Sequence, residues 1–437
     1  MQIKPARRIE GRVRLPGDKS ISHRAALVAA LATGKSHVSN FASSQDCAST
    51  LSCLEQLGIS IKRDGSDIQI EGRGRFHAPN GPLDCGNSGS TMRMLAGILA
   101  GQNFNSTLTG DNSLRSRPMK RIIAPLDLMS ARVFSESGRA PLRIEGHSPL
   151  KPIEYELPIA SAQIKTCILF AGLQADGSTK VIEKLGLTRD HTERMLKWFG
   201  APVDIVPTNS SEASSCAIVG PASFAGREVS IPGDFSSATF LITAAALIPG
   251  SDLQIEDVGL NPTRTQFLET LRSVGARIEV IEQREECNEP VGTIHIRSME
   301  PSETIAEGVP LTISGQLIAS LIDELPLMGV VGTQLPGGLV VRDAKELRFK
   351  ETDRIAAVVK NLRAMGAEVR ESEDGFAVAG PLRLKGALID SCGDHRIAMA
   401  FSIAGLLAEG VSEISNSECV GVSFPEFFNC LESVVQR

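Results

Sequence analysis

The stretch at residues 236–250, SSATFLITAAALIPG, decides the fold. Its first turn is polar, and the rest is apolar on nearly every side, so a helix formed here has no face to turn toward water. Such a helix must be enclosed by other elements. The stretch therefore predicts a buried helix of about three turns that closes near Gly250.

The same pattern occurs five more times along the chain. The other stretches are SISHRAALVAALATG (20–34), SGSTMRMLAGILAG (88–101), SAQIKTCILFAG (161–172), SGQLIASLIDELPLMG (314–329) and DHRIAMAFSIAGLLAEG (394–410). Successive starts lie 68, 73, 75, 78 and 80 residues apart. A period of this length favours an internal duplication within domains over a solenoid. Ala-rich helices also recur by accident in unrelated α/β proteins, so the period alone leaves that alternative open.

A second helix follows most of these stretches and ends in a recurrent tail. The tails are LEQLG, LKWFG, LRSVG and LRAMG, which close at Gly58, Gly200, Gly275 and Gly366. Alternating β-rich residues follow each glycine, as expected for a helix C-cap before a strand. Residues 126–133 and 427–435 are weaker copies. The repeat thus reads helix, strand, helix, strand, strand, and six copies predict two domains of three, with a crossover near Gly233.

Composition narrows the function classes. Of 437 residues, 42% are hydrophobic and 4% aromatic, and the formal charge is −6, which excludes wholesale disorder and gives no general attraction to nucleic acid or to an anionic membrane. The nine cysteines form no CxxC pair, so we expect buried thiols in a reducing compartment. With no signal-peptide pattern and no apolar run near 20 residues, we expect the cytoplasm.

The charged residues point to an anionic small molecule. Cationic side chains gather in the polar first turns, where unpaired N–H groups already favour anions. They are Lys19, Arg24, Arg93, Lys165, His395 and Arg396, with further charges at 115–118 and 345–354. Surface pairing of Lys19 and Arg24 with Asp18 is the plainer alternative. His23 and His395 lack a second ligand at metal-binding spacing, so no metal is expected.

Eight strings, in one order, carry a resemblance to a known family. They are LPGDKSISHRA (15–25), GNSGSTMR (86–93), RSRPM (115–119), SAQIKT (161–166), RDHTERML (189–196), KETDR (350–354), GDHRIAMAF (393–401) and SFPEFF (423–428). Together they resemble the 5-enolpyruvylshikimate-3-phosphate (EPSP) synthase family, over the whole chain. Its members join phosphoenolpyruvate to shikimate 3-phosphate with loss of phosphate.

The resemblance implies an α/β fold with two domains, an inside-out α/β barrel in which each domain has three βαβαββ units around buried parallel helices. The active site of the family lies in the cleft between the domains. Residues 1–19 then form a strand region of the second domain, residues 20–233 the first domain, and residues 234–437 the second. Neither a metal nor an organic cofactor is implied, and a monomer is expected.

The resemblance also assigns site residues. Those expected to bind shikimate 3-phosphate are Lys19, Ser20, Arg24, Ser161, Ala162, Gln163, Arg189, Asp323 and Lys350. Those expected to bind phosphoenolpyruvate are Lys19, Gly89, Arg117, Gln163, Arg354 and Arg396.

The expected catalytic residues are Asp323, Glu351 and Lys19. The reaction needs two acid/base groups, and Asp323 and Glu351 match the family positions, while a lysine stabilises the departing phosphate. Glu324 competes with Asp323 for the role of base. Glu351 could instead pair with Arg354 three residues on.

The chain departs from the better-known family pattern at three places. It has Ala162 where Ser is typical, Glu346 where Asn is typical and Val422 where Lys is expected. These changes resemble the second class of the family, often less sensitive to the herbicide glyphosate; Gly89, whose replacement by Ala commonly blocks the herbicide, is present. Two alternatives stay open: the sister enzyme that acts on UDP-N-acetylglucosamine, and a non-catalytic protein that binds a phosphometabolite.

Overall fold

Six helices are enclosed on nearly every side, as the apolar stretches predict. The computed structural model describes residues 1–207, 214–299 and 308–437. The six helices are α1 (Lys19–Leu31), α3 (Gly89–Ala100), α6 (Ala162–Gly172), α8 (Phe235–Leu247), α11 (Leu325–Gly332) and α13 (His395–Leu407). In α8, every residue except Leu247 is buried. These helices cannot exist at the surface, so they organise the rest of the chain.

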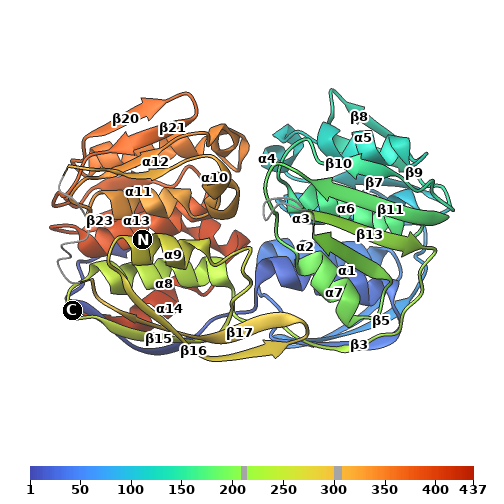
Figure 1. Cartoon of the computed structure of the whole chain (residues 1–437), viewed down its shortest axis with the longest axis horizontal. Helices are drawn as coiled ribbons and strands as arrows, with labels where there is room; N and C mark the ends of the chain where they lie inside the picture. Colours follow the sequence, from blue (N-terminus) through green and yellow to red (C-terminus); the bar gives the residue numbers. More distant parts are fainter. Residues whose placement is uncertain (208–213, 300–307) are drawn as a thin grey trace. The chain divides into compact units, whose positions relative to one another are not determined.

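The chain divides into two units with separate apolar cores. Unit 1 comprises residues 1–16, 232–284 and 290–437, and unit 2 comprises residues 17–231 and 285–289. Helices α1, α3 and α6 belong to unit 2, and helices α8, α11 and α13 belong to unit 1 (Figure 1). Each triplet lies in the core of its own unit.

The described strands of unit 2 form three four-stranded sheets of one design. In order across the sheet, the first consists of β6 (Leu83–Asp84), β7 (Asn105–Thr109), β9 (Arg139–Glu145) and β8 (Arg132–Glu136). The second consists of β10 (Glu154–Glu156), β11 (Gly177–Glu183), β13 (Ser214–Gly220) and β12 (Val203–Pro207). The third consists of β14 (Glu228–Ser230), β3 (Thr33–Ser39), β5 (Asp67–Arg73) and β4 (Ser60–Asp64). In each, the first two strands are parallel and the later pairs antiparallel. The repeat is βαβαββ, as expected, and β14 returns at the end of the unit to complete the sheet of its first repeat.

The sheets of unit 1 draw on both ends of the chain. In order across the sheet, the first consists of β18 (Leu311–Ile313), β19 (Leu339–Val341), β21 (Gly375–Val378) and β20 (Val369–Ser372). The second consists of β16 (Arg277–Glu286), β17 (Glu289–Arg297), β15 (Asp252–Gly259), β2 (Arg8–Arg14) and β24 (Val435–Gln436). The third consists of β1 (Gln2–Ile3), β23 (Ser412–Ser415) and β22 (Leu388–Asp390). Strand β2 is parallel to β15, and β1 is antiparallel to β23. The first residues of the chain therefore complete two sheets whose other strands come much later.

The remaining described helices do not belong to the buried triplets. They are α2 (Gln45–Gln56), α4 (Asn112–Ser116), α5 (Lys120–Leu128), α7 (His191–Trp198), α9 (Gln266–Ser273), α10 (Gln316–Leu321), α12 (Arg354–Ala364), α14 (Phe427–Val434) and the 3₁₀ turns η1 (Lys345–Phe349) and η2 (Ser417–Val422).

The structure differs from the sequence prediction in the fifth apolar stretch, residues 314–329. One buried helix was expected from Ser314, but the structure has α10, which is only partly buried, and then α11, which is wholly buried. Pro326 lies in the first turn of α11, where a missing N–H costs nothing and the fixed φ suits a helix start. The polar first turn of this repeat is therefore at Asp323 and Glu324.

The recurrent glycine tails close the outer helices as predicted. After α12, the N–H of Ala367 donates to the carbonyl of Leu362 and that of Gly366 to Arg363, the bond pair of a Schellman motif. Gly366 has φ +89°, and Gly58, Gly200 and Gly275 are also left-handed. The weaker copy after α5 closes in the same way with Ser130 at φ +71°.

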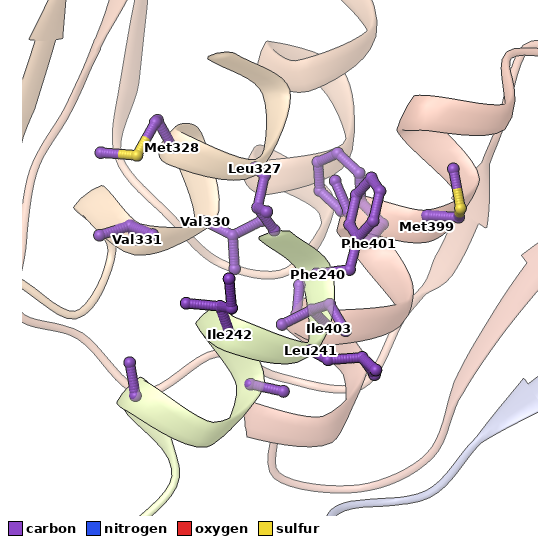
Figure 2. Close-up of a cluster of buried hydrophobic side chains, with 14 of the residues drawn as sticks. Phe240, Leu241, Ile242, Leu327, Met328, Val330, Val331, Met399, Phe401 and Ile403 are labelled. Atoms are coloured by element: carbon purple, nitrogen blue, oxygen red, sulfur yellow. The ribbon is translucent and has the colours of Figure 1, made fainter. Parts of the chain in front are cut away.

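Figure 2 shows how the buried helices of unit 1 pack. Ile242 of α8 and Val330 of α11 project toward each other, and Phe401 comes from α13. The rings of Phe240 and Phe427 meet edge to face at 5.8 Å between centroids. Each fully buried side chain of this size contributes about 1.5–3 kcal/mol by leaving water. The core of unit 1 thus packs these three helices against one another through apolar side chains.

The cysteines only partly follow expectation. All nine lie in the described residues and are free thiols; five are buried, Cys287, Cys419 and Cys430 are half-buried, and Cys392 is exposed. Within the ranges described, no helix is long and apolar enough to cross a membrane.

Substitutions at Gly366 and Ser130 test how much the left-handed helix caps contribute to the free energy of unfolding. We expect Gly366→Ala to lower the free energy of unfolding by about 1 kcal/mol, because a Cβ raises the cost of a positive φ. The new Cβ would meet nothing closer than 3.9 Å, so packing adds little. Ser130→Gly should raise stability by up to about 1 kcal/mol for the converse reason. Urea unfolding checks both; a stabilising Gly366→Ala would contradict the account.

Candidate active site

Five of the buried helices begin with a side chain that caps the first turn. Asp18, Ser88, Ser161, Asp234 and Asp394 each accept a hydrogen bond from a backbone N–H one turn or less ahead. The remaining N–H groups and the positive end of each helix dipole favour negative charge. Eight of the site residues expected from sequence lie at the N-cap or in the first two turns of α1, α3, α6 and α13: Lys19, Ser20, Arg24, Gly89, Ser161, Ala162, Gln163 and Arg396. Arg117 follows α4, Arg189 precedes α7, Asp323 precedes α11, and Lys350 and Glu351 precede α12, which begins at Arg354.

Lys19 opens α1. Its ammonium lies 2.9 Å from Asp46 Oδ2 in the first turn of α2, and a fifth of its side chain is exposed. Asp18 accepts from the N–H of Ile21. Ser20 follows Lys19 in the same turn and its carbonyl oxygen accepts from Arg24. The Lys19 cation is thus anchored but remains open on one side.

Arg24 is buried among neutral acceptors. Within the described residues it donates to Thr192 Oγ1 at 2.7 Å, to the carbonyl of Ser20 at 2.8 Å and to Thr166 Oγ1 at 3.1 Å. Burial lowers the pKa of Arg24 to about 10, and the charge of Arg189 acts in the same direction while Glu193 opposes it. An anion at this place would gain a guanidinium on α1 and a second one before α7, and would relieve their repulsion.

Gly89 lies between two guanidinium groups. A Cβ at this position would come within 2.7 Å of one terminal nitrogen of Arg93 and 3.4 Å of one of Arg117. Arg117 is buried and donates to Asn87 Oδ1 at 2.7 Å and to Ser113 Oγ at 3.2 Å. The absence of a side chain at Gly89 therefore leaves room beside these two cations.

The start of α6 adds polar groups to the same cluster. Ser161 caps the helix through the N–H of Ile164, and Ala162 is its first residue. Gln163 accepts from Arg93 at 2.7 Å and donates to Ser90 Oγ at 2.9 Å. Gln163 thus fixes the Arg93 guanidinium on α3 from the neighbouring helix.

Lys165 does not serve as an anion-binding cation, although its position in the first turn suggested so. Its ammonium lies 2.9 Å from Glu183 and 2.7 Å from Glu193, and all three side chains are buried. Burial alone would lower the pKa of Lys165, but the two carboxylates outweigh it and raise the pKa. The reason is three-dimensional: the partners come from β11 and α7.

In unit 1, a buried arginine organises the cluster. Arg354 begins α12 and donates to Asp394 Oδ2 at 2.8 Å and to Glu351 Oε2 at 2.7 Å. Burial alone would lower the pKa of Arg354, but Asp394 and Glu351 raise it further above its usual value. Glu351 therefore does form the ion pair that the sequence offered as its alternative role.

Asp323 lies among three cations. Its carboxylate is 3.9 Å from Lys350 Nζ, 3.6 Å from Arg354 and 3.8 Å from Arg396, and its side chain is 18% exposed. Glu324 beside it is buried, accepts from Ser236 Oγ at 2.7 Å and lies 3.5 Å from Arg396. Asp323 is thus the accessible carboxylate of the pair.

Lys350 and Arg396 complete the cluster. Burial lowers the pKa of Lys350; Asp323 opposes this effect and Arg354 reinforces it. Arg396 donates to the carbonyl of Asp323 at 3.2 Å, and its own N–H donates to Asp394. One carboxylate, Asp394, therefore holds the start of α13 and the side chain of Arg354 together.

Sequence reasoning gave no role to several residues that hold these groups. Arg93 was named only as a first-turn cation, and the resemblance assigned it to neither substrate; the structure adds that Gln163 holds its guanidinium. No sequence pattern predicts the contacts of Asp46, Asp394 and Ser236, because their partners lie on or before other helices. Each unit thus combines cations suited to anions with groups that fix their position, and unit 1 adds two carboxylates able to move protons.

Known proteins resemble the whole chain. The family model described as EPSP synthase (3-phosphoshikimate 1-carboxyvinyltransferase) matches residues 3–431. The 3-phosphoshikimate 1-carboxyvinyltransferase of Koribacter versatilis is 49% identical over 100% of this chain and 99% of its own, and that of Citrifermentans bemidjiense is 45% identical with the same coverage. The EPSP synthase structure from Acinetobacter baumannii has a TM-score of 0.84 at 38% identity, covering 99% of this chain and 98% of that one.

Lys165→Met tests the structural role of that lysine. We expect the free energy of unfolding to fall by about 3–5 kcal/mol, because two buried carboxylates lose their counter-charge. Lys180→Met is the control: its pair with Glu154 at 3.7 Å is exposed and should cost less than about 1 kcal/mol. Equal losses in the two variants, measured by urea unfolding, would contradict this role.

Proposed function

Because the chain belongs to the EPSP synthase family, we propose a role in its reaction for each residue of the two clusters. The enzyme transfers the enolpyruvyl group of phosphoenolpyruvate to the 5-hydroxyl of shikimate 3-phosphate and releases phosphate, a step of the shikimate pathway. One observation carries the assignment of roles: Asp323 remains accessible within 3.6–3.9 Å of three cations.

Shikimate 3-phosphate is proposed to bind through the first turns of α1 and α6. Arg24 and Arg189 supply two guanidinium groups, whose planar donors suit phosphate oxygens. Ser20, Ser161, Ala162 and Gln163 supply hydroxyl, amide and backbone groups at helix starts. The neutral acceptors around Arg24 support this role, because its charge is not already neutralised by a bonded carboxylate in the part of the chain that the structure describes. Lys350 and Asp323 are proposed to contact the same substrate.

The cations proposed to bind phosphoenolpyruvate are Lys19, Arg117, Arg354 and Arg396. Gly89 leaves space beside Arg117, and the side-chain amide of Gln163 is proposed to donate a hydrogen bond to the substrate. Carboxylates hold Arg354 in place before the substrate arrives, so binding requires little reorganisation.

Proton transfer is proposed for Asp323 and Glu351. In the addition step, the 5-hydroxyl oxygen bonds to C2 of phosphoenolpyruvate, its proton passes to Asp323, and C3 gains a proton from an acid, proposed to be Glu351. In the elimination step, C3 gives a proton back to Glu351, the C2–O bond to phosphate breaks with its electron pair leaving on the phosphate oxygen, and the double bond returns. The proton held by Asp323 then passes to the released phosphate, so both carboxylates return to their starting states. Lys19 stabilises the negative charge of the departing phosphate.

The setting is proposed to be the cytoplasm, with the enzyme acting as a monomer of two domains that correspond to units 1 and 2. The nine free thiols support a reducing compartment.

Asp323→Asn separates the two adjacent carboxylates. We expect kcat to fall by about 10²–10⁴-fold, because the amide cannot accept the proton. Glu324→Gln is the matched control and should keep most of the turnover, since the amide oxygen still accepts from Ser236. Phosphate release with both substrates measures this, with UDP-N-acetylglucosamine as the alternative acceptor. If Glu324→Gln were the inactive variant, the role of base would pass to Glu324.

Lys19→Met tests the cation of α1. We expect most turnover to be lost, by about 10²-fold or more, because the departing phosphate loses its counter-charge. The enzyme should still fold, with a lower thermal midpoint, because the buried Asp46 loses its partner. Lys35→Met, in an exposed part of β3, provides the control. A Lys19→Met enzyme with near-normal kcat would end the assignment of Lys19.

A further inference from the structure

The tip of the β16–β17 hairpin is bonded to unit 2 at three successive residues. Cys287 Sγ accepts from the N–H of Ser230 at 3.4 Å. Asn288 accepts through its carbonyl from Arg194 at 2.8 Å and donates through Nδ2 to the carbonyl of Arg194 at 3.3 Å. Glu289 Oε1 lies 2.7 Å from His191 Nδ1. These contacts explain why residues 285–289 group with unit 2 while the rest of the hairpin belongs to unit 1.

The backbone of the tip is strained. Cys287 has φ +51° and Asn288 has φ +63°, so both lie in the left-handed region. Two-residue hairpin turns of this kind favour Asn-Gly, and a cysteine there costs about 1 kcal/mol or more. Strain of this kind persists where surrounding contacts hold the backbone, and it clusters at functional sites. Both φ values are those that a two-residue hairpin turn requires, and the contacts of Cys287 and Asn288 with Ser230 and Arg194 hold them.

Glu289 is linked to Arg24 through two neighbouring residues. The side chains of Glu289 and His191 are both at most 3% exposed, so the carboxylate is held in place by its partner. His191 is the first residue of α7, and the next residue, Thr192, accepts from Arg24 Nε at 2.7 Å. Thr192 also shares a hydrogen bond of 2.5 Å with Thr166, a second acceptor of Arg24. A shift of the hairpin tip would thus move His191 and Thr192 and change the position of the Arg24 guanidinium.

The structure suggests a role for His191 and Thr192, the third and fourth residues of the RDHTE string (189–193). Its Arg189 is already placed at the anion site and its Glu193 in the buried pair with Lys165. His191 and Thr192 had no role from the reaction itself. They form the connection between the hairpin tip and Arg24.

We propose that the hairpin tip, acting through Glu289 and His191, fixes the position of Arg24 for the phosphate group of shikimate 3-phosphate. Glu289 and His191 are positioning residues, since their contacts reach Arg24 by way of Thr192. The proposal rests on the proposed function, because it takes Arg24 as a ligand of this substrate.

Steady-state kinetics with phosphate release tests the proposal on the full-length enzyme. Glu289→Ala should raise the KM for shikimate 3-phosphate about tenfold, because coupled residues of one network lose their shared contacts. The KM for phosphoenolpyruvate and kcat should stay within about twofold. Glu289→Gln should bring the KM for shikimate 3-phosphate back to within about threefold of wild type, because its amide oxygen still accepts a hydrogen bond.

The matched control is Glu279→Ala, which removes an exposed carboxylate from β16 of the same hairpin and should change neither KM. Asn288→Gly is a second, milder variant: glycine accepts the positive φ, and only the Nδ2 hydrogen bond is lost. It should raise the KM for shikimate 3-phosphate about threefold, and it decides the matter if Glu289→Ala does not fold.

Arg24→Met distinguishes a failure of the role proposed for Arg24 from a failure of the role proposed for the hairpin tip. If it leaves the KM for shikimate 3-phosphate unchanged, the assignment of Arg24 fails and the present proposal fails with it. If Arg24→Met raises that KM strongly while Glu289→Ala and Asn288→Gly leave it unchanged, only the role of the hairpin tip is overturned. Equal increases in both KM values, or a lower thermal midpoint at unchanged KM, would show a merely structural contact and would also overturn the proposal.

Discussion

A helix with no polar face can persist only where other elements enclose it, and this constraint shapes the whole chain. Each repeat supplies one such helix, and strands and outer helices of the three repeats cover it. Enclosure leaves the helix ends as the places where polar groups remain. In unit 2, Arg93 of α3 meets Gln163 of α6, and in unit 1, Ser236 of α8 meets Glu324 before α11. The sites therefore lie where burial of the helices ends.

The repeat and the glycine caps could be predicted from sequence, because each depends on signals close along the chain. The fold class was implied by the family resemblance, since pairing strands such as β2 and β15 lie far apart in the sequence. The polarity of a first turn and a glycine after a helix are local signals. The break between α10 and α11 was missed because apolar periodicity outweighed Pro326, which marks a helix start. The expectation that Lys165 binds an anion was wrong because its two carboxylates come from elements that no local pattern connects to it. The roles of the site residues rest on family resemblance and remain predictions.

The two clusters hold their cations in different ways. Arg24 is buried with hydroxyl and carbonyl acceptors, whereas Arg354 is buried with carboxylates. The first arrangement leaves positive charge available for a phosphate, at the cost of desolvating a guanidinium. The second neutralises much of that charge and gains a fixed geometry, which suits a group that must be in place before a short-lived intermediate forms. The two arginines thus differ in how far bonded carboxylates balance their charge.

The path of strands β1 and β2 has a consequence for synthesis on the ribosome. Ile3 pairs with Ser412 and Glu10 pairs with Asp252, so β1 and β2 are translated long before the strands with which they pair. The bulk of unit 2, residues 17–231, is contiguous and has almost all of its strands once β14 has been made. Because domains fold as units during translation at about 5–20 residues per second, unit 2 can fold while β2 still lacks β15. The sheet that contains β2 is complete only once β24 has been made.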